Sequence, residues 1–154
     1  MPEERGFVPA DFEPPTRLAV GDLQLEPLRP EHNERDYAAW TSSIDHIRRS
    51  PGFDESASWP REMSLAENRA DLERHARDFR DRAGFTYTVL GPDDDVVGCV
   101  YVYPADDGVH DARVLSWVRE SEAEQDGALR QAVADWLASD AWPFARPLYE
   151  PLLS

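Results

Sequence analysis

The chain has 154 residues, enough for one domain with one hydrophobic core, and its hydrophobic fraction of 41% excludes wholesale disorder. Its formal net charge is −15 and every basic residue is Arg, with no clustering into one segment. This excludes proteins that bind nucleic acid or anionic lipid through a basic surface. The charge favours a small amine or another cationic partner, or it serves solubility alone.

The N-terminal region contains no apolar core of a signal peptide, and no run is long enough to span a membrane. The single cysteine, Cys99, can form neither an internal disulfide nor a zinc site with other cysteines. The sequence therefore predicts a cytoplasmic protein that binds neither a metal nor a membrane. Residues 1–20, with four prolines, predict an extended arm before a single domain at 21–154.

The first half of the domain predicts one strand and two helical regions. Leucines at 23, 25 and 28 open a strand that ends at Pro30. Apolar side chains at helical spacing predict an amphipathic helical region that ends at residues 51–52: Tyr37, Trp40, Ile44 and Ile47. Ser64 and Glu67 form a capping box for the next helix, and Gly84 is its expected C-terminal stop. The expected apolar face of that helix is Leu65, Leu72, Ala76, Phe79 and Ala83.

The second half predicts three strands, one helix and a short last strand. Residues 85–90, 96–103 and 112–118 are apolar, and the first of these segments is rich in β-branched and aromatic residues, as is typical of strands. Leu129, Ala132, Val133, Trp136 and Leu137 follow helical spacing. Residues 147–153 predict the last strand.

This order of elements resembles the GNAT superfamily of acyl-CoA-dependent N-acyltransferases, over about residues 22–153. The segments that carry the resemblance are 25–30 (LEPLRP), 85–90 (FTYTVL), 97–102 (VGCVYV) and 114–118 (VLSWV). The resemblance implies an α+β, three-layer fold with a mixed sheet of about five strands and helices on both faces. It also implies acetyl-CoA as co-substrate and transfer of an acyl group to a small amine.

In this family the strand that matches residues 114–118 splays from its neighbour, and its backbone pairs with the pantetheine arm of the cofactor. The following turn holds the pyrophosphate through glycine-rich backbone amides. The resemblance therefore implies a cofactor site made of Ser116, Trp117, Val118, Arg119, Gln125, Gly127, Ala128, Leu129 and Arg130. The family's turn carries a Gln/Arg-x-x-Gly-x-Gly/Ala pattern. The turn of this chain has a glutamine, Gln125, and a glycine, Gly127, but they do not have the spacing of that pattern.

The turn itself is acidic, with carboxylates at Glu120, Glu122, Glu124 and Asp126. Ser121 and Glu124 have capping-box spacing, which predicts a helix that begins at Ser121 and uses its own first amides. Four carboxylates also repel a phosphate, although Arg119 and Arg130 offset part of this charge. Carboxylates that merely stabilise a helix N-terminus are the simpler interpretation.

The sequence leaves the catalytic residues unassigned. Candidates beside the splayed strand are Ser116, Tyr101, Tyr103 and Asp111, and the two tyrosines are more typical of core. No residue matches the tyrosine that protonates the leaving thiolate in many members. The four histidines have no metal-ligand spacing, and His75 falls off its helix's apolar stripe, which predicts a surface position. Trp59 and Trp142, which precede prolines, are the tryptophans expected at the surface, where they could cage a cation.

Three hypotheses follow from these residues. The first is a GNAT-like N-acetyltransferase. The second is a non-catalytic protein of the same fold that has lost CoA binding and binds a small cation or another protein. The third is a homodimer in which the N-terminal arm and the last strand complete a partner's sheet.

Overall fold

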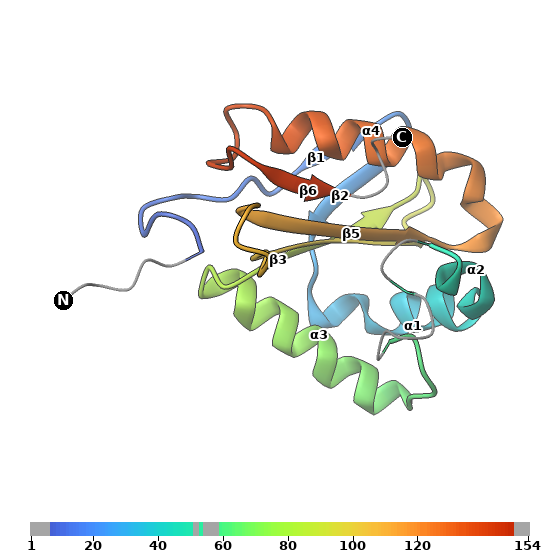
Figure 1. Cartoon of the computed structure of the whole chain (residues 1–154). Helices are drawn as coiled ribbons and strands as arrows, with labels where there is room; N and C mark the ends of the chain where they lie inside the picture. Colours follow the sequence, from blue (N-terminus) through green and yellow to red (C-terminus); the bar gives the residue numbers. More distant parts are fainter. Residues whose placement is uncertain (1–6, 51–52, 54–58, 150–154) are drawn as a thin grey trace.

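Six strands form one sheet in which each strand lies beside its neighbour in the sequence (Figure 1). The structure is a computed structural model and describes residues 7–50, 53 and 59–149. The strands are β1 (Leu18–Val20), β2 (Leu23–Pro27), β3 (Phe85–Leu90), β4 (Val96–Tyr103), β5 (Ala112–Val118) and β6 (Pro147–Tyr149). Neighbours from β1 to β5 are antiparallel, whereas β5 and β6 are parallel.

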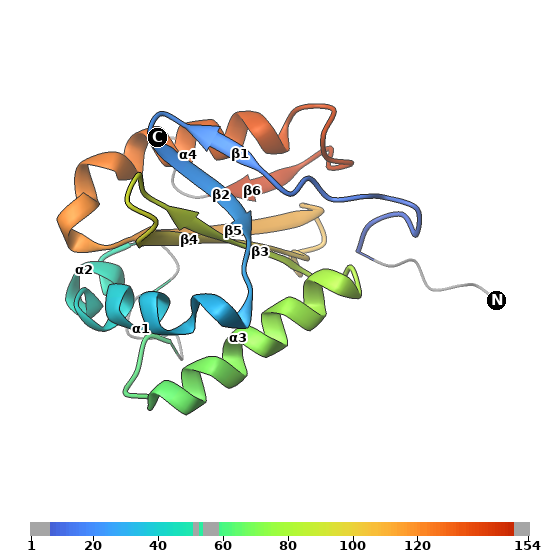
Figure 2. The same cartoon turned by 180° about the vertical axis from the view of Figure 1, so that it is seen from behind.

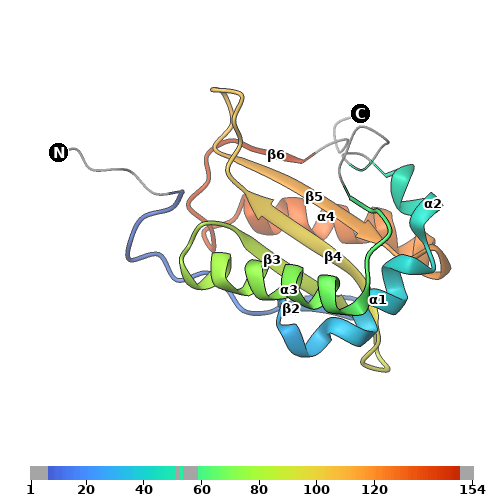
Figure 3. The ribbon, with the colours of Figure 1, turned by 90° about the horizontal axis from the view of Figure 1, so that it is seen from below.

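Helices cover both faces of this sheet. The helices α1 (Asn33–Thr41), α2 (Ile44–Arg48) and α3 (Leu65–Arg80) lie on one face, and α4 (Asp126–Leu137) lies on the other (Figures 1 and 2). Seen from below, α3 lies in front of the sheet and α4 behind it (Figure 3). The predicted mixed α+β fold with helices on both faces is confirmed. The sixth strand is β1, which lies inside the segment predicted as an arm and pairs with β2.

The capping box of α3 is confirmed, because Ser64 Oγ accepts from the Glu67 amide at 3.0 Å and Glu67 Oε1 accepts from the Ser64 amide at 2.8 Å. The prediction for its end is wrong. The helix ends at Arg80, and Arg82 with φ of 60° takes the left-handed position expected of Gly84. Gly84 serves a different purpose, since a Cβ there would lie 2.1 Å from the ring of Tyr103. Leu65, expected on the apolar face, is exposed.

The predicted helical region 37–47 is two helices, with Ser42 and Ser43 between them. Ser43 leaves the helical conformation, and its Oγ accepts a hydrogen bond from the backbone amide of Glu120 at 2.8 Å. This hydrogen bond links the N-terminus of α2 to the turn that follows β5. The expected stop at residues 51–52 lies outside the described residues.

The helix predicted to begin at Ser121 begins instead at Asp126. Residues Glu120–Gln125 form an irregular 3₁₀ segment, in which Glu122 departs from helical dihedrals. Gln125 occupies the cap position of α4 without a side-chain hydrogen bond, so the predicted Ser121–Glu124 box is wrong. The amide of Glu120 is already bonded to Ser43, and this tertiary contact fixes the start of the turn in a conformation that the local pattern does not predict.

Each sheet face has its own apolar core. The core under α4 includes Phe85, Tyr87 and Leu129, and the core under α1 includes Trp40, Cys99 and Trp117. The described part of the N-terminal segment, residues 7–17, packs on the α4 side: Val8 is buried, and the hydroxyl of Tyr87 donates to Pro15 O at 2.6 Å. Among the described residues, no helix is long and apolar enough to cross a membrane.

Candidate functional site

A cavity of about 470 Å³ opens between α1, α3 and the strands β4 and β5. Residues from a loop before α3 complete its wall, so segments distant in sequence meet there. The side chains that line it are Leu28, Asp36, Phe53, Trp59, Arg61, Asn68, Asp71, Leu72, Arg74, His75, Cys99, Tyr101, Tyr103, Pro104, Arg113 and Leu115. Its size falls within the range of small-molecule binding sites.

Asp36 is the buried carboxyl group of this cavity, with an exposed fraction of 5%. Its Oδ2 accepts from Asn68 Nδ2 at 3.0 Å, and Asn68 is held by Asn33 and by the indole N–H of Trp40. Burial raises the pKa of Asp36 to about 6, against the opposing hydrogen bond from Asn68. A carboxyl group with this pKa changes charge close to neutral pH, which is the property expected of a general base.

His75 projects into the cavity, so its predicted surface position is wrong. Its Nδ1 lies 2.9 Å from the hydroxyl of Tyr103, which itself donates to Asp78 Oδ2 at 2.8 Å. The same Nδ1 lies 3.1 Å from the hydroxyl of Thr86, so two hydroxyl groups hold the ring in the cavity wall. Desolvation, with a smaller contribution from Arg74, lowers the pKa of His75 to about 4, so the ring is neutral at pH 7.

The deepest part of the cavity wall consists of neutral polar groups. Trp117 Nε1 donates to the hydroxyl of Tyr101 at 3.0 Å. Burial raises the pKa of the Cys99 thiol and of Tyr101, and the charge of Asp36 adds to both shifts. Cys99 and Tyr101 are therefore protonated at neutral pH. Tyr101 and Tyr103, which the sequence treats as catalytic candidates more typical of core, are half-buried and line the cavity, and Tyr101 also packs against the core under α1.

The tryptophans form no surface cage among the described residues. Trp59 packs between Trp40 and Trp117, with ring centroids at 5.1 and 5.9 Å. Trp142 is buried on the opposite face against Trp136. The expectation that Trp142 lies at the surface is therefore wrong, whereas Trp59 is half-buried and lines the cavity.

The predicted cofactor residues of β5 lie between the two cores. Within the described residues, the pairing of β5 with β6 ends at Val114 and Tyr149. Along β5, the backbone N–H and C=O groups of successive residues point alternately toward β4 and away from it, and those of Ser116 and Val118 point toward the β6 side. Ser116, Trp117 and Val118 are all buried. The side chain of Trp117 faces the cavity side, whereas that of Ser116 faces α4 and lies 2.6 Å from the hydroxyl of Tyr149.

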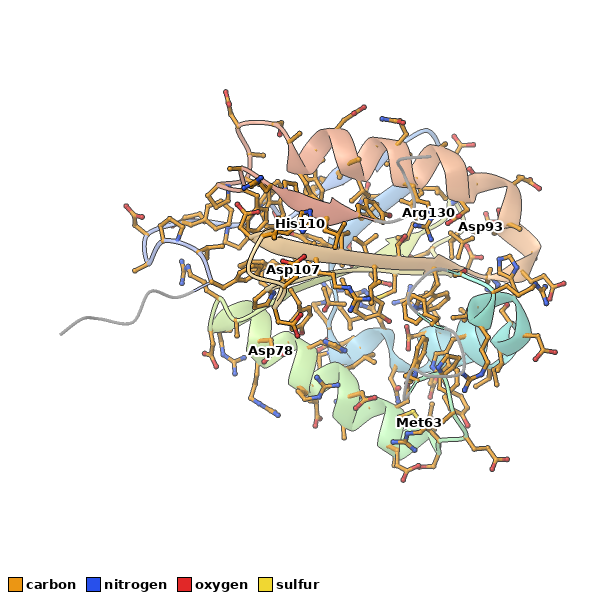
Figure 4. All side chains as sticks on the ribbon, viewed as in Figure 1. Met63, Asp78, Asp93, Asp107, His110 and Arg130 are labelled. Atoms are coloured by element: carbon orange, nitrogen blue, oxygen red, sulfur yellow. The ribbon has the colours of Figure 1, made fainter. Side chains whose placement is uncertain are left out.

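Arg130 closes this edge of β5. It projects from α4 toward β5 (Figure 4), its Nε donates to Asp126 Oδ2 at 2.9 Å, and a second nitrogen donates to Ser116 O at 3.4 Å. The guanidinium also lies over the ring of Tyr149. The carbonyl of Ser116, on the edge that the resemblance implies for the pantetheine arm, thus already accepts one hydrogen bond from a side chain.

The turn after β5 has three backbone amides that are already bonded within the protein. The amides of Glu120, Glu122 and Asp126 donate to Ser43 Oγ, Arg119 O and Ala123 O, respectively. Arg119, which could offset the acidic charge, instead donates to Val96 O and lies 3.9 Å from Asp95. Gln125 is partly exposed, Gly127 and Ala128 are exposed, and Leu129 is buried in the α4 core.

No family model matches the sequence, and no curated protein matches it. Solved structures do match. The chain is similar to RimL, a ribosomal L7/L12 α-N-protein acetyltransferase in complex with coenzyme A, at 16% identity and a TM-score of 0.63, over 79% of this chain and 67% of that one. It is also similar to a ribosomal-protein-S5-alanine acetyltransferase from Vibrio fischeri, at 13% identity and a TM-score of 0.61, over 80% and 68%.

A third similar structure is the microcin C7 self-immunity acetyltransferase MccE in complex with acetyl-CoA and AMP, at 15% identity and a TM-score of 0.59, over 76% of this chain and 61% of that one. The chain spans 64% of the length of apo RimL, another of these structures. At these identities the comparisons define the fold: the chain has the fold of the GNAT acetyltransferases. The neighbours include structures with CoA or acetyl-CoA bound.

Proposed function

We propose that the chain is a GNAT-type N-acyltransferase that moves an acyl group from a CoA thioester to an amine. The observation that carries the proposal is the position of Asp36: a buried carboxyl group in a cavity bounded by β4 and β5. The edge of β5 is where the resemblance implies the thioester. A protein N-terminus, the acceptor of the RimL neighbour, and a small amine both present the amino group that this reaction needs.

The chain's own groups suit an amine acceptor. An ammonium ion must lose a proton before its nitrogen can attack a carbonyl carbon, and Asp36, with a pKa near 6, can hold the ion and accept that proton. His75 is neutral and lines the same cavity, which makes it the second candidate base. A bound thioester would supply the acyl group, and its leaving thiolate would take up a proton.

Thermal unfolding with millimolar acetyl-CoA tests the proposal, with ATP and S-acetyl-pantetheine as comparisons. Binding to the native state at 100 times Kd stabilises it by about 2.7 kcal/mol, which raises the Tm of a chain of this size by about 5 °C or more. We expect a shift with both thioesters and none with ATP. An unchanged Tm with both thioesters contradicts the proposal.

The acidic turn supports a second candidate, a binding protein of the same fold that uses the cavity without CoA. Its four carboxylates, its occupied amides and the bond from Arg130 to Ser116 all oppose the cofactor. This candidate predicts that ligands of the cavity raise the Tm while both thioesters leave it unchanged. We also propose that the chain forms a homodimer, which is tested by measuring whether its mass in solution depends on concentration. A cytoplasmic location remains a further proposal.

A further inference from the structure

The chain as a whole is acidic, whereas the cavity is lined by more arginines than aspartates. The sequence has 31 acidic residues and 16 arginines, yet the cavity is lined by three arginines and two aspartates. The arginines are Arg61, Arg74 and Arg113, and the aspartates are Asp36 and Asp71. One of these aspartates, Asp36, is the buried group already described. Exposed charges farther apart than about 8 Å are largely screened at physiological salt, so a ligand here responds to these neighbours more than to the net charge.

Two of the three arginines have no ion-pair partner among the described residues. Arg113 is exposed on the cavity side of β5, and its side chain makes no ion pair or hydrogen bond with any described residue. Arg61 donates to the backbone oxygen of Glu62 at 3.2 Å, and no carboxylate in the described ranges pairs with it. Arg74, by contrast, has an ion-pair partner in Asp71 at 3.4 Å. Arg113 and Arg61 are therefore the groups able to receive an anion.

The buried part of the cavity contains an acidic group rather than a basic one. Asp36 is buried, and its described hydrogen-bond partner is the neutral amide of Asn68. A buried carboxylate without a cation is costly, so an ammonium group is its natural counterpart. Leu28, Leu72 and Leu115 add apolar side chains to the lining of the cavity. The cavity thus combines an ammonium site at its floor with an anion site at its rim.

We propose that the cavity binds a small amine that also carries a carboxylate, with the amino group at Asp36 and the carboxylate at Arg113 and Arg61. This class comprises amino acids and short peptides with both ends free. It differs from the simple cation that the net charge suggests, because a polyamine would bring positive charge to two unpaired guanidiniums. That such a ligand would be the acyl acceptor rests on the proposed function, whereas its binding does not.

Calorimetric titration of the full chain with three probes tests the proposal, in the absence of any thioester. The probes are the dipeptide Ala-Ala, its C-terminal amide, which lacks the carboxylate, and N-acetyl-Ala-Ala, which lacks the amine. We expect Ala-Ala to bind at least tenfold more tightly than either derivative. Equal or tighter binding of the amide would overturn the proposal, and so would absence of binding by all three probes at 10 mM.

Variants assign the two ends of the ligand. Arg113→Gln should weaken Ala-Ala about tenfold, which corresponds to about 1.4 kcal/mol, and leave the amide unchanged. Arg80→Gln is the matched control, since it removes one exposed arginine from α3 outside the cavity and should change neither Kd by more than twofold. Asp36→Asn should weaken both probes that carry an amine and spare N-acetyl-Ala-Ala.

The two proposals fail separately. Tight binding of Ala-Ala with no shift of Tm by acetyl-CoA would keep the ligand class and reject the acyltransferase. A shift with acetyl-CoA, together with an Arg113→Gln variant that binds Ala-Ala as well as the parent chain, would keep the acyltransferase and reject the ligand class.

Discussion

The cavity and the turn after β5 differ in their charges. The cavity is lined by three arginines and two aspartates, in a chain with net charge −15. The turn gathers four carboxylates, of which Asp126 is paired with Arg130, whereas Arg119 contacts Val96 O and Asp95 instead. This difference supports the proposal that the cavity is a binding site, while the turn departs from the glycine pattern that the resemblance implies.

The largest expected effect concerns the strand contact between these two regions. A Cβ on Gly98 would lie 2.2 Å from the backbone oxygen of Trp117, so Gly98→Ala must push β4 away from β5. We expect a loss of about 3 kcal/mol in the free energy of unfolding, measured by urea denaturation. Gly127→Ala is the control, because its Cβ meets nothing within 4 Å and should stabilise α4 by up to about 1 kcal/mol. Equal stability of the two variants would contradict the close packing of β4 and β5.

The next effect separates the two titrating groups of the cavity. The native pKa of Asp36 is raised to about 6, so the native state binds more protons than the unfolded state between pH 4 and 6, and stability rises as the pH falls. The pKa of His75 is lowered to about 4, so its contribution falls with the pH over the same window. The two contributions nearly cancel in the parent chain.

Single variants should separate the two contributions to the pH dependence of the free energy of unfolding. Asp36→Asn leaves the His75 contribution, and we expect the free energy of unfolding to drop by about 2–3 kcal/mol from pH 6.5 to 4. His75→Gln leaves the Asp36 contribution, and stability should rise by a similar amount from pH 6 to 4. Urea denaturation at four pH values measures both slopes. Parallel curves for the two variants would contradict this assignment.

A smaller effect tests the closed edge of β5. Arg130→Met removes the partner of Asp126, whose other oxygen is already buried without a hydrogen bond. We expect a loss of about 2 kcal/mol in stability, because a partly buried carboxylate is left uncompensated. The same variant frees Ser116 O, so protection by S-acetyl-pantetheine should increase. Gln131→Met, exposed on the same helix, is the control and should change neither quantity.

The smallest effect tests the repulsive charge of the turn. Replacement of Glu120, Glu122 and Glu124 by Gln removes three carboxylates that are exposed or partly exposed. If acetyl-CoA binds, its Kd should fall about tenfold at low salt, whereas the Kd of S-acetyl-pantetheine, which lacks the diphosphate, should stay within twofold. Equal improvement for both thioesters would contradict a repulsion directed at the diphosphate.

The sequence predicted the strands β3, β4 and β5 and the helices α3 and α4, because their periodicity and the Ser64 capping box are local signals. The start of α4 was wrong because Ser43, distant in the chain, binds the amide of Glu120. The position of His75 was missed because Tyr103 and Asp78 draw a polar side chain inward without any apolar spacing. The cavity is lined by residues of α1, the loop before α3, α3, β4 and β5, and no single stretch of sequence contains it.

The division of the tryptophans between the two sheet faces gives this protein two independent optical reporters. Trp40, Trp59 and Trp117 form one chain of rings beside the cavity, and Trp136 and Trp142 form a pair 5.3 Å apart under the N-terminal segment. Closely spaced indoles couple their transitions, so near-ultraviolet circular dichroism carries a signal from each group. Replacing Trp142 by Phe should silence the signal from the α4 face, so that ligand binding can be followed from the cavity alone without a label.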